Sequence, residues 1–170
     1  MSALRYCRKY LHGPARMKAR RVTRRASAKA SAPAHVWSMG RRPLVLLAED
    51  DAAMRDLIAS DLRREGYEVV EAPHAEGLFA HIGRLVTVGG GAPDSIAVII
   101  SDVRMPGLSG MDVLTAVRKA SSKTPVILIT AFGSEEIHHQ AAELGARAVL
   151  DKPFAIEELR ALVRQAVNRC

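Results

Sequence analysis

Residues 96–102 spell Ile-Ala-Val-Ile-Ile-Ser-Asp, a nearly continuous apolar run that ends in a carboxylate. The run is short and rich in β-branched residues, which is typical of a strand buried on both faces of a parallel sheet. Three further runs share this pattern and also lead into polar residues: 44–48 before Glu49-Asp50-Asp51, 125–129 before Thr130, and 146–150 before Asp151-Lys152-Pro153. The ends of parallel strands meet at one edge of the sheet, where open α/β folds bind ligands. The sequence therefore predicts a cleft that contains carboxylates, a hydroxyl and an ammonium group.

Amphipathic segments of helical length separate these strands, and a further strand is expected at 67–72. This alternation predicts an α/β domain over residues 43–170 with five strand and helix pairs. Gly66 is expected to end the first helix, and Ser109 and Ser134 to cap the third and fourth. Leu144 is placed on the inward face of the fourth helix. Residues 87–95 are expected to form a flexible surface loop, and no second folded domain is expected after the last helix, at about 155–168.

Residues 1–42 differ in composition from the rest of the chain. They contain 12 of the 25 Lys and Arg residues and none of the 18 Asp and Glu residues. Like-charge repulsion and few apolar side chains predict a disordered basic tail. Three alternatives remain: a true start at Met39, a segment that contacts nucleic acid or an anionic membrane, and an organelle transit peptide.

Cysteine content and hydropathy favour a cytoplasmic protein. Cys7 and Cys170 are too few for a disulfide framework, which fits a reducing compartment. No apolar run approaches the roughly 18 residues that would span a bilayer. No membrane span is therefore expected.

The polar residues at the strand ends have the chemistry of a phosphoryl site. Asp50 and Asp102 can supply the oxygens that Mg²⁺ prefers, Lys152 can place a positive charge on a phosphoryl group, and Thr130 can donate a hydrogen bond to it. Each residue alone has a simpler explanation, since an Asp after a strand is usually a helix cap and a loop Lys is usually solvated. Their convergence on one edge favours the functional interpretation.

Four motifs in this order resemble the receiver domain of two-component response regulators. They are Leu46-Leu47-Ala48-Glu49-Asp50-Asp51, the segment Ser101-Asp102-Val103-Arg104-Met105-Pro106-Gly107-Leu108-Ser109-Gly110, Thr130-Ala131, and Lys152-Pro153-Phe154. The resemblance covers residues 44–168 and is to a stand-alone receiver like a chemotaxis regulator. It implies a doubly wound, flavodoxin-like five-stranded parallel sheet of order 2-1-3-4-5 with helices on both faces.

The resemblance also implies a reaction and a cofactor. Asp102 is the expected phosphorylation site, taking a phosphoryl group from a phosphohistidine on a sensor histidine kinase or a histidine phosphotransfer protein in a reaction that needs Mg²⁺. The remaining implied roles are Asp50 as a direct metal ligand, Glu49 as a ligand through water, the backbone carbonyl of Arg104 as a further ligand, and Thr130 and Lys152 as catalytic residues that hold the phosphoryl oxygens.

The residues implied in signal transmission depart from the family pattern at one position. In the family, Thr130 moves toward the phosphoryl group and an aromatic residue three positions before the lysine turns inward. That position is Val149 here, which has no ring to bury. Phe132 is a candidate to take over this role, with core or lid packing as the simpler interpretation.

Three outputs fit these features. The first is a phosphorylation switch that selects a protein target and only secondarily acts as an enzyme, by catalysing its own phosphorylation and dephosphorylation. The second is a phosphate shuttle or sink in a phosphorelay, and the third is a nucleic-acid-binding regulator that uses the basic tail.

Other polar residues gave weaker predictions. His138 and His139 are adjacent on a helix and point about 100° apart, which disfavours a shared metal. His74 and His81, seven residues apart, have no third ligand in view. Arg118 lies at a helix end and is expected to be solvated.

Overall fold

The computed structural model describes residues 42–87, 96–120 and 122–168. Apart from Arg42 and Thr87, the predicted tail and the predicted loop at 87–95 lie outside these residues. Strands and helices alternate along the chain as follows: β1 Leu44–Ala48, α2 Ala52–Arg64, β2 Glu68–Ala72, α3 Ala75–Thr87, β3 Ile96–Asp102, α4 Gly110–Lys119, β4 Val126–Thr130, α5 Glu135–Glu143, β5 Ala148–Asp151 and α6 Ile156–Val167.

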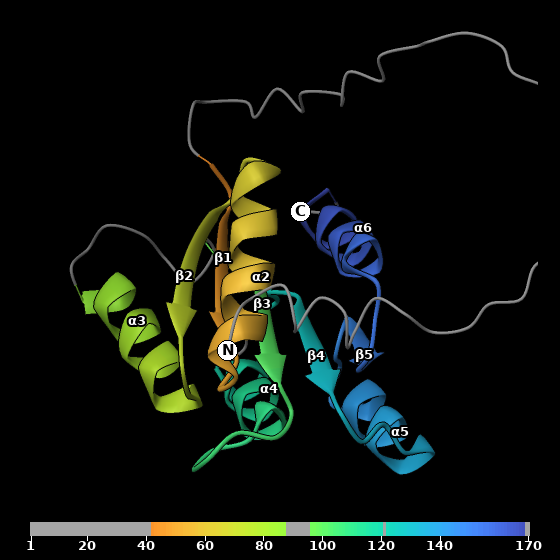
Figure 1. Cartoon of the computed structure of the whole chain (residues 1–170). Helices are drawn as coiled ribbons and strands as arrows, with labels where there is room; N and C mark the ends of the chain where they lie inside the picture. Colours follow the sequence, from red (N-terminus) through yellow and green to blue (C-terminus); the bar gives the residue numbers. More distant parts are fainter. Residues whose placement is uncertain (1–41, 88–95, 121, 169–170) are drawn as a thin grey trace, which may run out of the picture.

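The five strands form one parallel sheet of order β2-β1-β3-β4-β5 (Figure 1). This confirms the doubly wound fold and its strand order. The order reverses beside β1, because β2 lies on one side of it and β3 on the other. Such a reversal opens a crevice at the carboxyl ends of the strands, here between β1 and β3.

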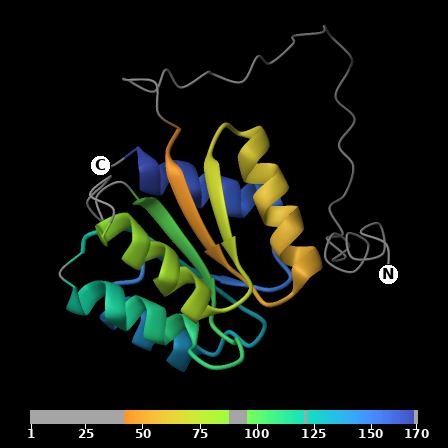
Figure 2. The ribbon, with the colours of Figure 1, turned by 90° about the vertical axis from the view of Figure 1, so that its left-hand side faces the viewer.

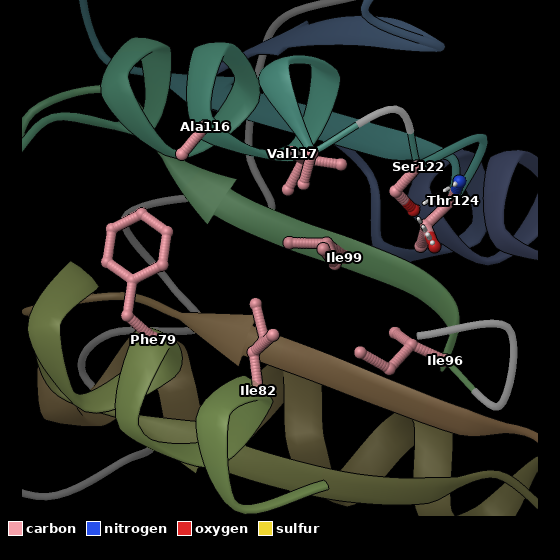
Figure 3. Close-up of a pocket in the computed structure, with 9 residues that line it drawn as sticks. Phe79, Ile82, Ile96, Ile99, Ala116, Val117, Ser122 and Thr124 are labelled. Carbon is pink, nitrogen blue, oxygen red and sulfur yellow. Dashed lines mark hydrogen bonds between the residues drawn. The ribbon is translucent and has the colours of Figure 1, made fainter. Parts of the chain in front are cut away.

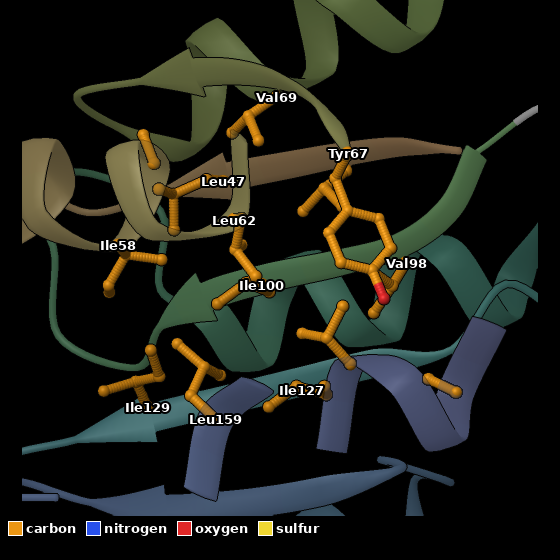
Figure 4. Packing of buried hydrophobic residues seen from close by; sticks show 14 of the residues in the cluster. Leu47, Ile58, Leu62, Tyr67, Val69, Val98, Ile100, Ile127, Ile129 and Leu159 are labelled. Carbon is orange, nitrogen blue, oxygen red and sulfur yellow. The ribbon is translucent and has the colours of Figure 1, made fainter. Parts of the chain in front are cut away.

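Helices cover both faces of the sheet because the strand side chains alternate between them (Figure 2). Val45 and Leu47 of β1 belong to a core shared with α2 and α6 (Figure 4). Arg160 of α6 also binds the buried carboxylate of Asp61 in α2 at 2.6 and 3.0 Å. Apolar packing and this ion pair together fix α2 and α6 beside each other.

The opposite face of the sheet is covered by α3, α4 and α5. Leu46 and Ala48 point into this second core, which includes Leu78 of α3 and Leu114 of α4. A cavity of about 170 Å³ remains between α3 and α4, beside the first half of β3 (Figure 3). Its lining is apolar except for two hydroxyl groups and consists of Phe79, Ile82, Ile96, Ile99, Ala116, Val117, Ala120, Ser122 and Thr124.

The predicted helix ends are confirmed. Gly66 follows α2 at φ 96°, a conformation that glycine adopts without steric cost. Ser134 accepts a hydrogen bond from the Ile137 amide, and Ser109 forms a reciprocal capping box with Asp112. These caps fix where α4 and α5 begin, immediately after the loops that follow β3 and β4.

Two predictions about side-chain environment were wrong. Leu144 is 38% exposed, because α5 ends at Glu143 and Leu144 is its C-cap rather than a residue of its inner face. Arg118 is not simply solvated, since its guanidinium donates to the carbonyls of Ser122, Thr124 and Gly145. It joins the end of α4 to the turn before β5.

The described fold begins and ends at the same edge of the sheet. β1 starts at this edge, and α6 runs back to it after β5 has reached the opposite one (Figure 1). The carboxyl edge, by contrast, is formed by the loops after each strand.

Candidate phosphorylation site

Three carboxylates meet at the carboxyl edge of the sheet, beside the point where the strand order reverses. Glu49 and Asp50 follow β1, and Asp102 ends β3. One carboxylate oxygen from each lies within 4.8 Å of the other two. Glu49 and Asp102 are buried, whereas Asp50 is exposed. The predicted convergence of these residues is confirmed, and Asp50 forms the open side of the cluster.

Lys152 reaches the same cluster from the residue after β5. Its Nζ donates to both Glu49 oxygens, at 2.9 and 2.8 Å, and also to Asp102 Oδ2. The ammonium group therefore lies between the two buried carboxylates. Strands β1, β3 and β5 each contribute to this one set of contacts.

Burial and neighbouring charges shift the titration of the two residues that are paired here. The pKa of the Glu49 carboxyl is raised from 4.5 to about 7, chiefly because burial disfavours its charged form; the hydrogen bond from Lys152 opposes this rise, and the negative charge of Asp102 adds to it. Burial alone would lower the pKa of Lys152, but hydrogen bonds to Asp102 and Glu49 outweigh this effect and raise it. Lys152 thus stays protonated at neutral pH, while Glu49 titrates within the physiological range.

The donor set fits a hard divalent cation. Carboxylate oxygens are the preferred ligands of Mg²⁺, which commonly binds through one or two of them together with water. Three carboxylates and one ammonium group leave a surplus of negative charge at the edge, and Asp50 remains accessible from solvent. The three carboxylates therefore offer the kind and number of ligands that such an ion needs.

The backbone around Asp102 holds its side chain in place. Asp102 Oδ1 accepts a hydrogen bond of 2.8 Å from the amide of Arg104. Gly110, the first residue of α4, packs against the Asp102 carbonyl so closely that a Cβ at this position would overlap it. With Oδ2 bound by Lys152, both oxygens of Asp102 have a fixed donor.

Thr130 and Val149 lie beside the cluster rather than in it. Thr130 ends β4, is fully buried, and accepts a hydrogen bond of 3.1 Å from the Phe132 amide through its Oγ1. Val149 lies within β5, opposite Leu128, and packs partly buried against the core under α3, α4 and α5. The structure therefore places Thr130 at the same edge as Asp102 and Val149 two residues further from it.

Comparison with known proteins identifies the family. The model of the response regulator receiver domain matches residues 45–164. This chain belongs to the response regulator receiver domain family. The match contains every carboxylate of the cluster as well as Thr130 and Lys152.

The receiver domain resembles curated regulators and solved receiver structures. It is 36% identical over 126 residues to the uncharacterized transcriptional regulatory protein YkoG of Bacillus subtilis, covering 74% of this chain and 51% of that protein. It is 30% identical to the transcriptional regulatory protein FixJ of Bradyrhizobium diazoefficiens, covering 74% and 57%. The chain thus spans about half the length of these relatives.

A solved structure with a similar fold is the chemotaxis protein CheY4 of Vibrio cholerae. The TM-score is 0.64 at 30% identity, and the alignment covers 74% of this chain and 99% of CheY4. The receiver domain of Francisella response regulator 1452 gives a TM-score of 0.64 at 29% identity, covering 75% of this chain and 98% of that one.

Among the helices of the described part of this receiver domain, none is both long and apolar enough to cross a membrane.

Phe132 does not pack into the core of the receiver domain. Its side chain is 59% exposed, and the guanidinium carbon of Arg104 lies 4.1 Å from the ring centroid. A cation over an aromatic face is attracted by the ring electrons. The loops after β3 and β4 are therefore joined by a contact that the spacing of the two residues did not reveal.

Two further features were not predicted from the sequence. Asp51 caps α2 by accepting from the Met54 amide at 2.9 Å, so the Glu49-Asp50-Asp51 triplet divides between a site and a helix cap. His138 binds Asp151, with its Nε2 at 3.0 and 3.2 Å from the two carboxylate oxygens. For the contact of His138 with Asp151, the sequence offered one indication, namely that Asp151 directly precedes Lys152.

Proposed function

We propose that this receiver domain accepts a phosphoryl group on Asp102 from a phosphohistidine of a sensor histidine kinase or a histidine phosphotransfer protein. The observation that carries the proposal is the environment of Asp102. Its carboxylate is held by Lys152 and the Arg104 amide, and it lies beside two more carboxylates suited to Mg²⁺. Glu49 is also bound by Lys152 and by a backbone amide, that of Asp51 at 3.4 Å, but Lys152 binds both of its oxygens, whereas it binds only Oδ2 of Asp102.

In the proposed reaction, a carboxylate oxygen of Asp102 attacks the phosphorus of the phosphohistidine. The new O–P bond makes an acyl phosphate as the N–P bond breaks, and the imidazole leaves with its electron pair and takes up a proton. Lys152 balances the charge of the transferred group, since its ammonium already contacts Asp102 Oδ2. Positioning and electrostatics dominate this kind of transfer.

Asp50 and Asp102 would hold the Mg²⁺ ion directly, Glu49 would bind it through water, and the carbonyl of Arg104 would complete the protein ligands. The ion would neutralise negative charge on the phosphoryl oxygens as they approach three carboxylates. The position of Asp50 on the open side of the cluster supports this assignment.

Phosphorylation would then alter the surface that binds a protein target. We propose that the Thr130 hydroxyl donates to the phosphoryl group and that the loop of residues 131–134 follows, because its Phe132 amide is bonded to the Thr130 hydroxyl. Val149 cannot add an aromatic ring to this movement. The chain would act mainly as a switch, and its partner is a protein that distinguishes the two states.

The test is phosphorylation with a small phosphodonor and Mg²⁺, followed by mass spectrometry. Wild type is expected to gain one phosphoryl group on Asp102, and Asp102→Asn none. Asp112→Asn is the matched control, because this exposed carboxylate belongs to a helix cap. Equal modification of the Asp102→Asn protein would reject the proposed acceptor.

The lifetime of the acyl phosphate separates the switch from a phosphate shuttle or sink. A switch retains the group long enough to engage its target, whereas a shuttle returns it rapidly to a second histidine protein. The third alternative, contact with nucleic acid through residues 1–42, depends on residues that, apart from Arg42, the structure does not describe.

A further inference from the structure

A contact outside the carboxylate cluster joins α5 to the end of β5. His138 lies in the first turns of α5, and Asp151 is the last residue of β5. The His138 Nε2 lies 3.0 Å from Asp151 Oδ1 and 3.2 Å from Oδ2. Both side chains are partly exposed, at 41% and 54%, so neither is needed to fill the core.

The Asp151 end of this contact is held firmly in the sheet. Asp151 lies opposite Thr130 in the β4 and β5 pair, and the next amide, that of Lys152, donates to the Thr130 carbonyl at 2.7 Å. The side chain of Lys152 is in turn bound to Glu49 and Asp102. The end of β5 is therefore restrained by both its backbone and its neighbouring ammonium group.

The loop between β4 and α5 rests on the Asp151 carboxylate. Gly133 lies so close that a Cβ at this position would overlap Asp151 Oδ1. Residues 131–134 are exposed, and the loop also contacts the domain through the Phe132 amide, which bonds to Thr130, and through the Phe132 ring, which lies against Arg104. His138, four residues beyond Ser134, bonds to the same carboxylate and fixes the start of α5 above it.

We propose that the pair of His138 and Asp151 is a latch that holds the 131–134 loop in its unphosphorylated position. This rests on the proposed function, in which the loop follows Thr130 toward Asp102. Such a shift would move Gly133 and His138 relative to the Asp151 carboxylate, because the backbone next to Asp151 is held to β4 by the Lys152 amide. The contact therefore opposes the shift, and His138 is a positioning residue that acts through Asp151 and the loop.

The test measures the affinity of the domain for beryllofluoride, a phosphoryl analogue, in the presence of Mg²⁺, by isothermal titration calorimetry. Removing the latch with His138→Ala is expected to tighten binding by about two- to fivefold, the range for one exposed pair. A variant that had lost part of its structure would bind beryllofluoride more weakly. Tighter binding therefore cannot be explained by damage to the fold. His138→Gln, whose amide can also donate to Asp151, should restore the affinity of wild type.

A neighbouring histidine provides the matched control. His139 lies next to His138 on α5, is more exposed, and pairs with Glu143 of its own helix, at 3.5 Å. His139→Ala should leave the affinity unchanged. Asp151→Ala should tighten binding as His138→Ala does, and the double variant should bind no more tightly than either single variant, because one contact is lost in all three.

The outcomes separate the latch from the function on which it rests. Unchanged or weaker binding in His138→Ala, or equal tightening in His139→Ala, would overturn the latch while leaving Asp102 as the acceptor. Wild-type protein that binds beryllofluoride no better than Asp102→Asn would overturn both the proposed function and the latch.

Discussion

Glu49 has the least usual environment of any described carboxylate, because it is fully buried yet binds an ammonium group with both oxygens. Its carboxyl has a pKa of about 7 rather than 4.5. The folded protein therefore binds a proton here over a pH range in which the unfolded chain has released it. Folding becomes less favourable as pH rises through that range.

Glu49→Gln should remove this pH dependence. In the absence of divalent cations, the stability of wild type should fall relative to the variant between pH 4.5 and about 7, and the difference should stay constant above that range. At about 1.4 kcal/mol per pKa unit, the full change is of the order of 3 kcal/mol. Urea unfolding of both proteins at pH 5 and pH 8 measures it. Parallel pH profiles would show that Glu49 titrates normally.

Asp50 differs from Glu49 because it is exposed, so its removal should affect ion binding and not folding. Asp50→Ala is expected to weaken Mg²⁺ binding by about tenfold or more, since it removes a proposed direct ligand. Asp56→Ala provides the control, because Asp56 is also an exposed carboxylate and lies on α2, outside the cluster. Titration calorimetry with Mg²⁺ compares the three proteins. Unchanged affinity in Asp50→Ala would place the ligand elsewhere.

At the scale of elements, β4 and β5 carry the two residues expected to transmit the signal, and they differ in character. Thr130 ends β4 and connects directly to the 131–134 loop through the Phe132 amide. Val149 is embedded in β5 with only its short branched side chain against the core. Movement is therefore expected to pass along α5 rather than along β5 and α6.

Amide hydrogen exchange with and without beryllofluoride tests this path. Changes in protection should concentrate between Thr130 and Leu144, and the segment from Val149 to Leu159 should change little. If the largest change in protection falls instead between Val149 and Leu159, a valine transmits the signal as well as an aromatic residue does.

The cavity between α3 and α4 predicts a gain in stability. Ala116→Leu places three more carbon atoms in an apolar space of about 170 Å³ and should raise stability by up to about 2 kcal/mol. Ala142→Leu, at an exposed position of α5, controls for helix propensity and should have little effect. Thermal unfolding distinguishes them. If Ala116→Leu lowers the melting temperature and Ala142→Leu does not, the cavity cannot accept the larger side chain.

The elements show which features a sequence can predict. The strands and the convergence of Asp50, Asp102 and Lys152 follow from local periodicity, because the ends of parallel strands must share an edge. The contacts of His138 with Asp151 and of Arg118 with three carbonyls do not, since they depend on how loops position side chains from different elements. Leu144 was placed inward by periodicity that continued one residue beyond the helix.

For the whole molecule, charge separates the chain into two parts. The first 42 residues are basic and free of acidic groups, whereas the receiver domain carries all 18 Asp and Glu residues. Only Arg42 of this segment lies within the described residues. The expectation for the segment therefore comes from its composition.

Deleting residues 1–42 should leave the melting temperature and the rate of phosphorylation nearly unchanged, because so few apolar side chains can add little buried area. Thermal unfolding and phosphodonor kinetics of the full-length and shortened proteins measure both quantities. A fall of many degrees would show that the segment packs on the domain. A gel-shift series in salt with both proteins tests the nucleic-acid alternative.

The common edge at which β1 begins and α6 ends has a practical consequence for protein engineering. A reporter or an effector module fused before β1 or after α6 would project from the side opposite Asp102. A histidine kinase would then approach the proposed acceptor, Asp102, from the side away from the fused module. The two attachment points also lie at the same edge of the sheet, away from α5. A pair of fluorophores placed there would therefore report on unfolding of the domain rather than on movement of α5.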